Sequence, residues 1–458
     1  MAASPKSTCG YPPAFPPKGQ PVALRVGSED RSIRHSRRIR LATHAATAPL
    51  VELLGDFLVR TRRILSFFAA SLIAFAPLHA AAQDQEESVS VQERSRADYD
   101  PLGVRLGAFM LHANLDGAVT HTDNLFADPF AEEEDTIYTV GAHAHLDSTW
   151  SRHAIGADAG FVSVTHDEFS SEDHETYYAG LRGRLDIGRA SNIGIAARVS
   201  HEVEPRSDPD AGGIGTPLNE YDRTSLTATA QHAFNRFRIS GAAWQHENDY
   251  EDLQNFRDFT STGGSARLDV ELTPRIGVFG QASVDERDYD NDPTLSSDGR
   301  TYLVGASIDF TDLMEGEIAV GHFEREYANG GSSDGLAVSA NLEWYITRLT
   351  TISLDASRNS EEVIGVSAEP YVLTRFGARV DHELRRNVIL TAGARLANRE
   401  FLADDREDDH MRYDAGVDWI VNRRVALEAR VEHEEVDSNA PLVEFDENRV
   451  TLGISLRL

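Results

Sequence analysis

Apolar and polar residues alternate along almost the whole chain from residue 102 to residue 458. The pattern is clearest in the last ten residues, Arg449–Leu458, where every second residue is aliphatic and the others are polar or glycine. Successive side chains of a β-strand point to opposite faces, so this segment predicts a strand with one aliphatic and one polar face. Any half-buried antiparallel sheet alternates in this way, and the prediction therefore depends on how often the pattern repeats.

The alternating runs repeat with two kinds of connection between them. Eight short polar turns and nine longer loops, rich in Asp, Glu, Asn, Gly and Ser, make seventeen connections and therefore predict eighteen strands. The turns are centred on Ser151–His153, Arg189–Ser191, Asn235–Arg236, Thr273–Arg275, Thr311–Leu313, Thr347–Leu349, Arg385–Asn387 and Asn422–Arg424. The loops include Asn124–Asp135, Glu204–Asn219, Asp290–Gly299 and Phe401–Asp409.

Short turns at one end and long loops at the other are typical of an outer-membrane barrel. The runs are long enough to cross a bilayer as tilted strands, which takes about 9–11 residues. A soluble sandwich requires neither such uniform strands nor such a regular alternation of connections. We therefore predict an all-β fold over residues 101–458: a transmembrane antiparallel β-barrel of about eighteen strands, or sixteen if one pair is miscounted.

The alternation also assigns the two faces of each predicted strand. In residues 136–148, Tyr138, Val140 and Leu146 would face lipid, whereas His143 and His145 would face the lumen. The lipid-facing residues near strand ends include several aromatic side chains, which are typical of the interfacial girdle of such barrels. They are Tyr138, Tyr302, Trp344, Tyr413 and Trp419.

The segment before the barrel has the pattern of a targeting signal. The basic stretch Val59–Arg63 is followed by the apolar stretch Ile64–Leu78 and by three alanines before Gln83, which predicts a cleaved signal peptide over residues 59–82. Residues 1–58 are interpreted as a mis-assigned, disordered extension upstream of the true start. Residues 83–100 are acidic and polar without apolar spacing, and we predict that they form a flexible periplasmic lead-in.

The charge of the chain limits its partners. The formal net charge is −30, and residues 1–82 hold 11 basic and 4 acidic residues against 33 and 70 in the remainder. So acidic a surface makes nucleic acid an unsuitable partner. Cys9 is the single cysteine, so the chain cannot form an internal disulfide or carry a lipid on a cysteine after the signal peptide.

The start of the predicted barrel resembles a known family. Residues 101–126 read P-L-G-V-R-L-G-A-F-M-L-H-A-N-L-D-G-A-V-T-H-T-D-N-L-F, and this is similar to the entry of the putative β-barrel porin 2 family of bacterial outer-membrane proteins. One departure from the usual barrel pattern is Leu458, where an aromatic residue is common. The residues that carry the resemblance are Pro101, Gly103, Arg105, Gly107, Phe109, Asp123, Asn124 and Phe126.

The resemblance implies a bacterial outer-membrane location and a part in exopolysaccharide export. It implies outer-membrane lipid, lipopolysaccharide, the barrel-assembly machinery and components of polysaccharide export as partners. Two other functions stay open: a general diffusion porin for small solutes, and a non-conducting surface scaffold or adhesin.

Candidate functional residues lie on the polar faces of the predicted strands. Arginines and carboxylates there could line a selective pore, or could only pair with one another across strands. The candidate pore-lining residues are Arg182, Arg184, Arg267, Arg375, Arg379, Arg395, Glu428, Arg430 and Glu432. A Gly-Gly pair at residues 212–213 of the longest loop suggests that this loop could fold inward.

Motifs for catalysis and metal binding are weak. The sequence has neither a Gly-x-Ser-x-Gly elbow nor a His-Glu-x-x-His motif, so no enzymatic activity is predicted. The spacing of His143 and His145, with Asp147, could place two imidazoles near a metal ion. The preferred interpretation is that these residues line a polar lumen. No cofactor is expected beyond Ca²⁺ or Mg²⁺ on acidic outer loops, at Glu132–Asp135, Asp404–Asp405 and Glu407–Asp409.

Overall fold

The computed structural model describes residues 89–208, 211, 215–311, 313–363, 369–402, 405–440 and 443–458. The predicted extension, the predicted signal peptide, residues 83–88 and the Gly-Gly pair of the longest loop lie outside the described residues. In the part of the chain that is described, no helix is long and apolar enough to cross a membrane.

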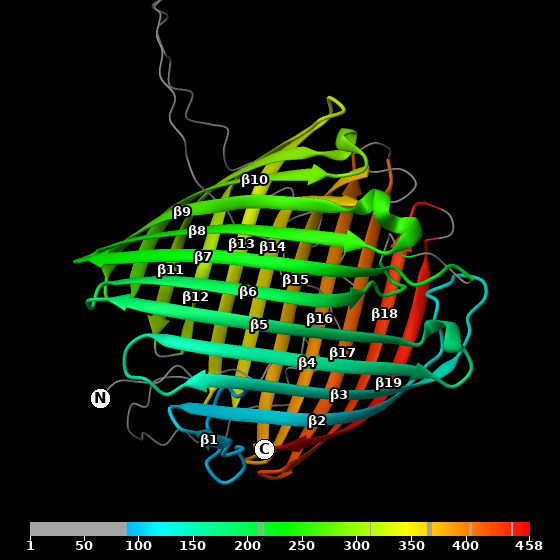
Figure 1. Ribbon diagram of the computed structural model, residues 1–458, viewed down its shortest axis with the longest axis horizontal. Coiled ribbons are helices and arrows are strands. Elements are labelled where there is room, and N and C mark those ends of the chain that lie inside the picture. The colour runs from blue at the N-terminus through cyan, green and yellow to red at the C-terminus, as the bar shows by residue number, and fades with distance from the viewer. Residues whose placement is uncertain are drawn as a thin grey trace, which may run out of the picture. The chain divides into compact units, whose positions relative to one another are not determined.

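The described chain forms nineteen strands and three short 3-10 helices (Figure 1). They are β1 (Val104–Leu106), β2 (Phe109–Thr122), β3 (Asp135–Ser148), β4 (Ala154–His166), η1 (Ser170–Glu172), β5 (His174–Ile187), β6 (Ser191–Val203), β7 (Glu220–Phe234), β8 (Phe237–Tyr250), η2 (Asp252–Arg257), β9 (Phe259–Thr273), β10 (Ile276–Tyr289), η3 (Pro293–Leu295), β11 (Ser297–Thr311), β12 (Met314–Tyr327), β13 (Ser332–Thr347), β14 (Thr350–Val363), β15 (Glu369–Arg385), β16 (Val388–Phe401), β17 (Glu407–Asn422), β18 (Val425–Ser438) and β19 (Phe445–Arg457).

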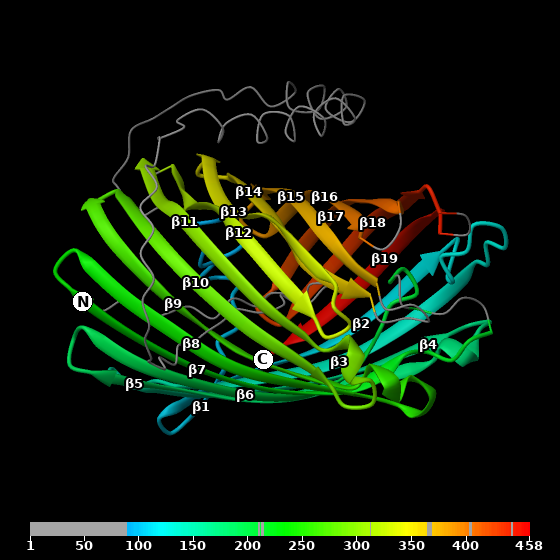
Figure 2. The same ribbon diagram turned by 90° about the horizontal axis from the view of Figure 1, so that it is seen from above.

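Strands β2 to β19 close into one antiparallel barrel, and each pairs with its neighbours in chain order (Figure 2). The closing pair is β19 with β2, in a register that places Leu452 opposite Val119 and Ile454 opposite Gly117. Closure leaves no unpaired strand edge. The prediction of eighteen membrane-spanning strands is confirmed, and β1 is an additional short strand paired only with β2.

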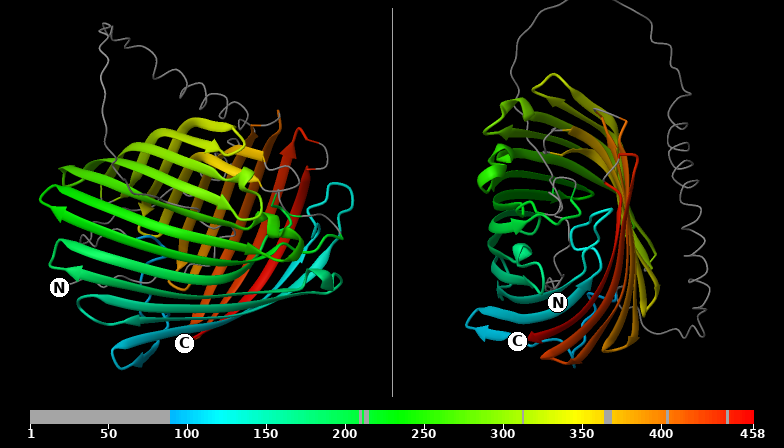
Figure 3. Two further views of the ribbon diagram at one scale, coloured as in Figure 1. Left: turned by 45° about the horizontal axis from the view of Figure 1, so that its top comes forward. Right: turned by 90° about the vertical axis from the view of Figure 1, so that its right-hand side faces the viewer.

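The two ends of the barrel differ as the sequence predicts (Figure 3). All eight predicted turns join consecutive strands, and they define the turn end; the nine loops define the loop end. Two predicted loops are shorter than expected, because Ser297–Gly299 and Glu407–Asp409 continue strand pairing. Polar residues pair between strands as well as apolar residues do, so polarity alone placed the starts of β11 and β17 too late.

One face of the wall carries the aliphatic side chains, and these are exposed. Val140 is 63% exposed, and the residues on the aliphatic face of β19 are exposed as well. Tyr138, Tyr302, Trp344 and Trp419 lie exposed on the same outward face. The candidate pore-lining charges lie on the opposite face, which encloses the lumen. Toward the loop end, other charged residues, such as Arg300 and Glu326, lie on the outward face.

The family-like entry forms a small hairpin rather than the first spanning strand. Gly103 and Gly107 have φ angles of +68° and +63°, a backbone conformation that glycine adopts at least cost, and they flank β1. The Arg105 Nε donates a hydrogen bond to the Gly107 carbonyl at 3.2 Å, and Phe109 opens β2 with its ring 5.7 Å from Trp150. Pro101 precedes this hairpin directly.

Residues 89–100 differ from the predicted flexible lead-in, because they pack on the inner wall near the turn end. Val91 is fully buried against Ile389 and Ile420, and its amide donates to the Thr351 hydroxyl at 3.0 Å. Polar side chains hold the segment on both sides of Val91. Gln92 donates to Asp381 at 2.7 Å, Arg94 pairs with Glu383 at 3.2 Å, and Arg423 donates to the Ala97 carbonyl. Contacts made by one apolar side chain and a few polar pairs leave no periodic pattern in the sequence. The alternation of apolar and polar residues therefore could not predict the packing of residues 89–100.

Candidate functional site

The inner face of the barrel brings all nine candidate pore-lining residues to one surface. Each lies on the face of its strand opposite to the face that carries the exposed aliphatic residues. Seven of the nine take part in ion pairs with other inner-face residues, and two do not. The pairs form separate groups on different parts of the wall.

The first group lies on β3 to β6. Arg182 pairs with Asp147 and, at 3.4 Å, with Asp158. Arg198 reaches the other oxygen of Asp158 at 3.0 Å and lies over the Tyr178 ring, 3.7 Å from its centre. Both arginine side chains are nearly half exposed, so this group presents hydrogen-bonding atoms of both signs to the lumen. Arg184 forms a separate pair with Asp186, at 3.0 Å.

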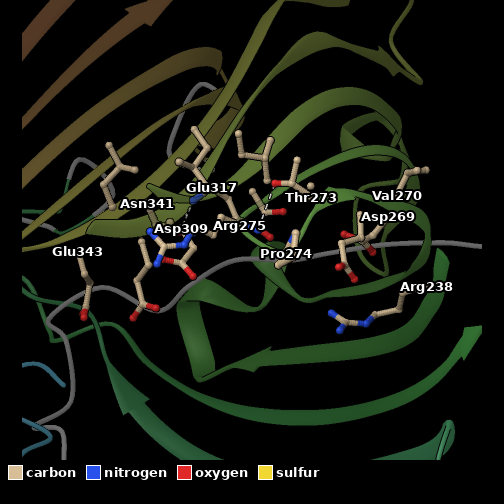
Figure 4. A pocket seen from close by; sticks show the side chains of 18 of the residues that line it. Arg238, Asp269, Val270, Thr273, Pro274, Arg275, Asp309, Glu317, Asn341 and Glu343 are labelled. Atoms are coloured by element: carbon tan, nitrogen blue, oxygen red, sulfur yellow. Dashed lines mark hydrogen bonds between the residues drawn. The ribbon is translucent and has the colours of Figure 1, made fainter. Parts of the chain in front are cut away.

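The second group lies on β9 to β12. Arg267 pairs with Asp269 at 2.8 Å and with Glu317 at 2.6 Å, and its guanidinium lies 3.6 Å from the centre of the Phe279 ring. Asp269 and Glu317 also border a cavity of about 760 Å³ at the turn end (Figure 4). The cavity is lined by inner-face side chains of β7 to β14 and by the turn residues that include Arg275.

The third group lies on β15 to β19. Arg379 pairs with Asp381 at 2.9 Å, beside the packed segment 89–100. Arg430 joins two carboxylates, Asp414 and Glu428, at 2.9 Å each. Glu432 lies between two arginines, 3.9 Å from Arg412 and 3.8 Å from Arg449.

Arg375 and Arg395 are the two exceptions. Among the described residues, neither has a hydrogen-bonded or ion-paired partner. Both border a small hollow on the inner wall, together with Arg399 and His410. The sequence identified Arg375 and Arg395 but not Arg399, whose side of the strand follows from the same alternation.

The loop end is held by buried ion pairs that the sequence did not indicate. Glu204, at the start of the longest loop, accepts two hydrogen bonds from Arg257 of η2, at 2.9 and 2.7 Å, and one from the Tyr250 hydroxyl. Arg206, in the same loop, pairs with Glu172 of η1 at 2.8 Å. The β4–β5, β6–β7 and β8–β9 loops are therefore joined to one another by ion pairs. The only sequence feature that could have suggested these ion pairs is the high density of charged residues in the loops.

Asp258 adjoins this region at the end of η2. Burial raises the pKa of the Asp258 carboxyl above its ordinary value, while the hydrogen bond donated by the Tyr250 amide at 2.7 Å lowers it. The nearby carboxylates Asp249 and Asp290 raise the pKa further. The folded loop therefore binds the Asp258 proton more tightly than the unfolded chain does.

The second half of the family-like motif lies just beyond β2 and fastens the barrel seam. Asp123 accepts hydrogen bonds from the amide of Asn448 and from its side chain, at 2.7 and 2.8 Å. Asn124 is buried and donates to the carbonyls of Asp128 and Asp446, at 3.0 and 2.9 Å. Phe126 is buried edge-on against Phe169. These residues tie the first loop to β19, where the barrel closes.

The histidines singled out from the sequence do not converge. His145 stacks on His112, and His143 lies between Asp116 and Tyr178. In the described part of the chain, a grouping with suitable ligand spacing is His201, Glu220 and Glu251, on the outward face at the loop end. The Asp222 carboxylate lies 2.9 Å from His201 Nδ1 and leaves Nε2 to face Glu220.

In the predicted acidic site at Glu407–Asp409, Asp408 is fully buried and paired with Arg406.

A closed barrel with an exposed aliphatic outer face and a charged inner face defines a class of protein. It is an outer-membrane β-barrel channel of the porin type rather than an enzyme. The family model described as "Putative beta-barrel porin 2" matches residues 96–458, and the chain belongs to this family. The resemblance of residues 101–126 to that family is thereby confirmed.

Solved structures with a similar chain path have low sequence identity to this chain. Pseudomonas aeruginosa OpdL is 13% identical, with 77% of this chain and 100% of that chain covered and a TM-score of 0.41. Pseudomonas aeruginosa OccK2 (OpdF) is 12% identical, with 77% and 99% covered and a TM-score of 0.45. Acinetobacter baumannii OccAB2 is 10% identical, with 76% and 98% covered and a TM-score of 0.45. No curated protein matches the chain.

Proposed function

We propose that this barrel passes hydroxyl-rich solutes or polymers across the outer membrane, and that its role is in exopolysaccharide export. Outer-membrane lipid, lipopolysaccharide, the barrel-assembly machinery and components of polysaccharide export are the partners that belong to this proposal. Passage of a saccharide requires a wall that binds hydroxyl groups without holding the chain too tightly.

The observation that carries the proposal is the charge compensation of the inner wall. Arg182 and Arg198 share Asp158, and Arg182 also pairs with Asp147. A small ion entering such a wall meets both signs of charge and gains little net attraction. A hydroxyl group can donate to the carboxylates and accept from the guanidinium groups, in place of the water it leaves.

The same wall also suits a general diffusion porin, which would pass small charged and neutral solutes according to size alone. A non-conducting scaffold would need a blocked lumen, and the ion pairs that fasten the loops favour a rigid outer surface. The three functions differ in what crosses the membrane, and a flux measurement therefore distinguishes them.

The experiment is solute entry into liposomes that contain the purified protein. We expect oligosaccharides to enter faster than amino acids or organic ions of the same charge and hydrodynamic size. Entry that depends on size alone would assign the general porin. Absence of entry for every solute, with protein that still shows a heat-modifiable gel shift, would assign the scaffold.

A further inference from the structure

We propose that Arg375, Arg395 and Arg399, on the inner face of β15 and β16, form a binding site for the carboxylate of an acidic saccharide. This inference rests on the proposed function, because it names the chemical class of solute that the channel selects. Most arginines of the inner wall described above already have carboxylate partners, and these three do not.

Strand register places the three guanidinium groups around residues with small side chains. Arg375 lies opposite Ala397, and Arg395 lies opposite Gly377. Arg395 and Arg399 are separated by one inner-face residue, Ala397, so their Cα atoms are roughly 13 Å apart in an extended strand. Long arginine side chains can converge over the space that Gly377 and Ala397 leave. All of these residues border the same hollow.

The donor groups of these arginines have no acceptor among the described residues. Arg399 is only 6% exposed, yet it has no hydrogen bond or ion pair there. A carboxylate would satisfy two donors of one guanidinium at once, because the two planar groups match in geometry.

The neighbouring charges leave this part of the wall positive. Arg412 also borders the hollow and pairs with Glu434, and it therefore adds little net charge. Asp355 lies beside Gly377 without an ion pair and is a carboxylate that faces the site. Among the residues that border the hollow, three arginines without partners face one carboxylate without an ion pair, which leaves a positive surplus. This surplus would bind an acidic sugar unit more tightly than a neutral one.

The test compares two probes that block current through single channels of the full-length protein. One probe is an acidic trisaccharide of galacturonate units, and the other is a neutral trisaccharide of glucose units. We expect the acidic probe to block at about tenfold lower concentration, as a charge-assisted hydrogen bond predicts. Replacing Arg395→Gln should raise the blocking concentration of the acidic probe by about the same factor and leave the neutral probe unchanged.

Two further variants and a second readout complete the design. Arg395→Lys keeps the charge and should retain part of the preference, whereas Arg424→Gln removes an exposed arginine from the β17–β18 turn and should have no effect. Equilibrium binding of both probes to protein in detergent gives the same comparison without conduction. Equal binding of both probes, or equal loss in Arg395→Gln and Arg424→Gln, would overturn the inference alone. If neither probe binds or blocks, the proposed function fails with it.

Discussion

At the scale of single residues, the inner wall uses shared carboxylates rather than isolated ion pairs. Asp158 lies between two arginines, and Arg430 lies between two carboxylates. In such an arrangement the removal of one side chain leaves a charge on a partner that has lost its compensation. The effect should therefore appear in ion selectivity before it appears in stability, since these side chains are in contact with water.

The clearest case is Arg182→Gln. Asp147 then loses its arginine, while Asp158 keeps Arg198, so the local wall gains one uncompensated negative charge. We expect the reversal potential in a KCl gradient to shift toward cation selectivity, and the shift to shrink at high salt. The double variant Arg182→Gln with Asp147→Asn should return selectivity to the wild-type value. A reversal potential unchanged in the single variant would mean that this group does not line the conducting path.

A second residue-scale prediction concerns Asp258. Its folded pKa is raised, so the loop is most stable when the carboxyl is protonated, and this stability is lost as the pH rises through the raised pKa. We expect hydrogen-exchange protection of residues 251–258, corrected for the intrinsic rate, to fall over that range. Asp258→Asn keeps an acceptor for the Tyr250 amide and should remove the pH dependence. Identical pH profiles for the two proteins would contradict this explanation.

At the scale of elements, the strands followed from the sequence and their supporting contacts did not. All eight tight turns were predicted correctly, because alternation has to break where polar turn residues occur. Residues 83–100 were predicted to form a flexible periplasmic lead-in. The packing of residues 89–100 could not be predicted, because it depends on side chains of β14 to β17 that are distant in sequence. Arg399 is a similar case. The alternation predicts that its side chain lies on the inner face of the barrel, but whether it has a partner depends on the side chains of β15, β16 and β17 together.

The packed segment gives an element-scale prediction. Val91→Asp would place a carboxylate in an apolar contact close to Asp381 and Glu383, and it should release residues 89–100 from the wall. We expect faster tryptic cleavage after Arg94 and Arg96, followed by mass spectrometry. Val89→Asp is the matched control, because Val89 is 37% exposed. Equal cleavage in the two variants would show that the Val91 contact does not hold the segment.

At the scale of the whole molecule, the two faces of the wall meet different solvents. A charge at the middle of the outward face must enter hydrocarbon, and a charge on the inner face need not. Val140→Arg should therefore destabilise the folded barrel in lipid by about 2–4 kcal/mol, whereas Thr139→Arg, one residue away on the inner face, should cost much less. Reversible urea unfolding in lipid vesicles measures both. Equal destabilisation would contradict the assignment of the faces.

The whole-molecule account joins a closed barrel to a charge-compensated lumen. Closure by β19 and β2 lets the wall cross a membrane without an unpaired edge, and the aliphatic outer face makes that environment favourable. The inner face is polar because alternation places the candidate pore-lining arginines and carboxylates there. The alternation of apolar and polar residues therefore determines both the barrel fold and the polar lumen. The selectivity of the channel depends on which charged residues of the lumen pair with one another.

The measurement that tests the central claim most directly is single-channel conductance of the purified protein in a planar bilayer, with oligosaccharides added to one side. The account predicts stable current steps with weak ion selectivity, and transient block by the sugars. Current that sugars leave unchanged would contradict saccharide passage and favour the general porin. Absence of current from folded, heat-modifiable protein would contradict the channel itself.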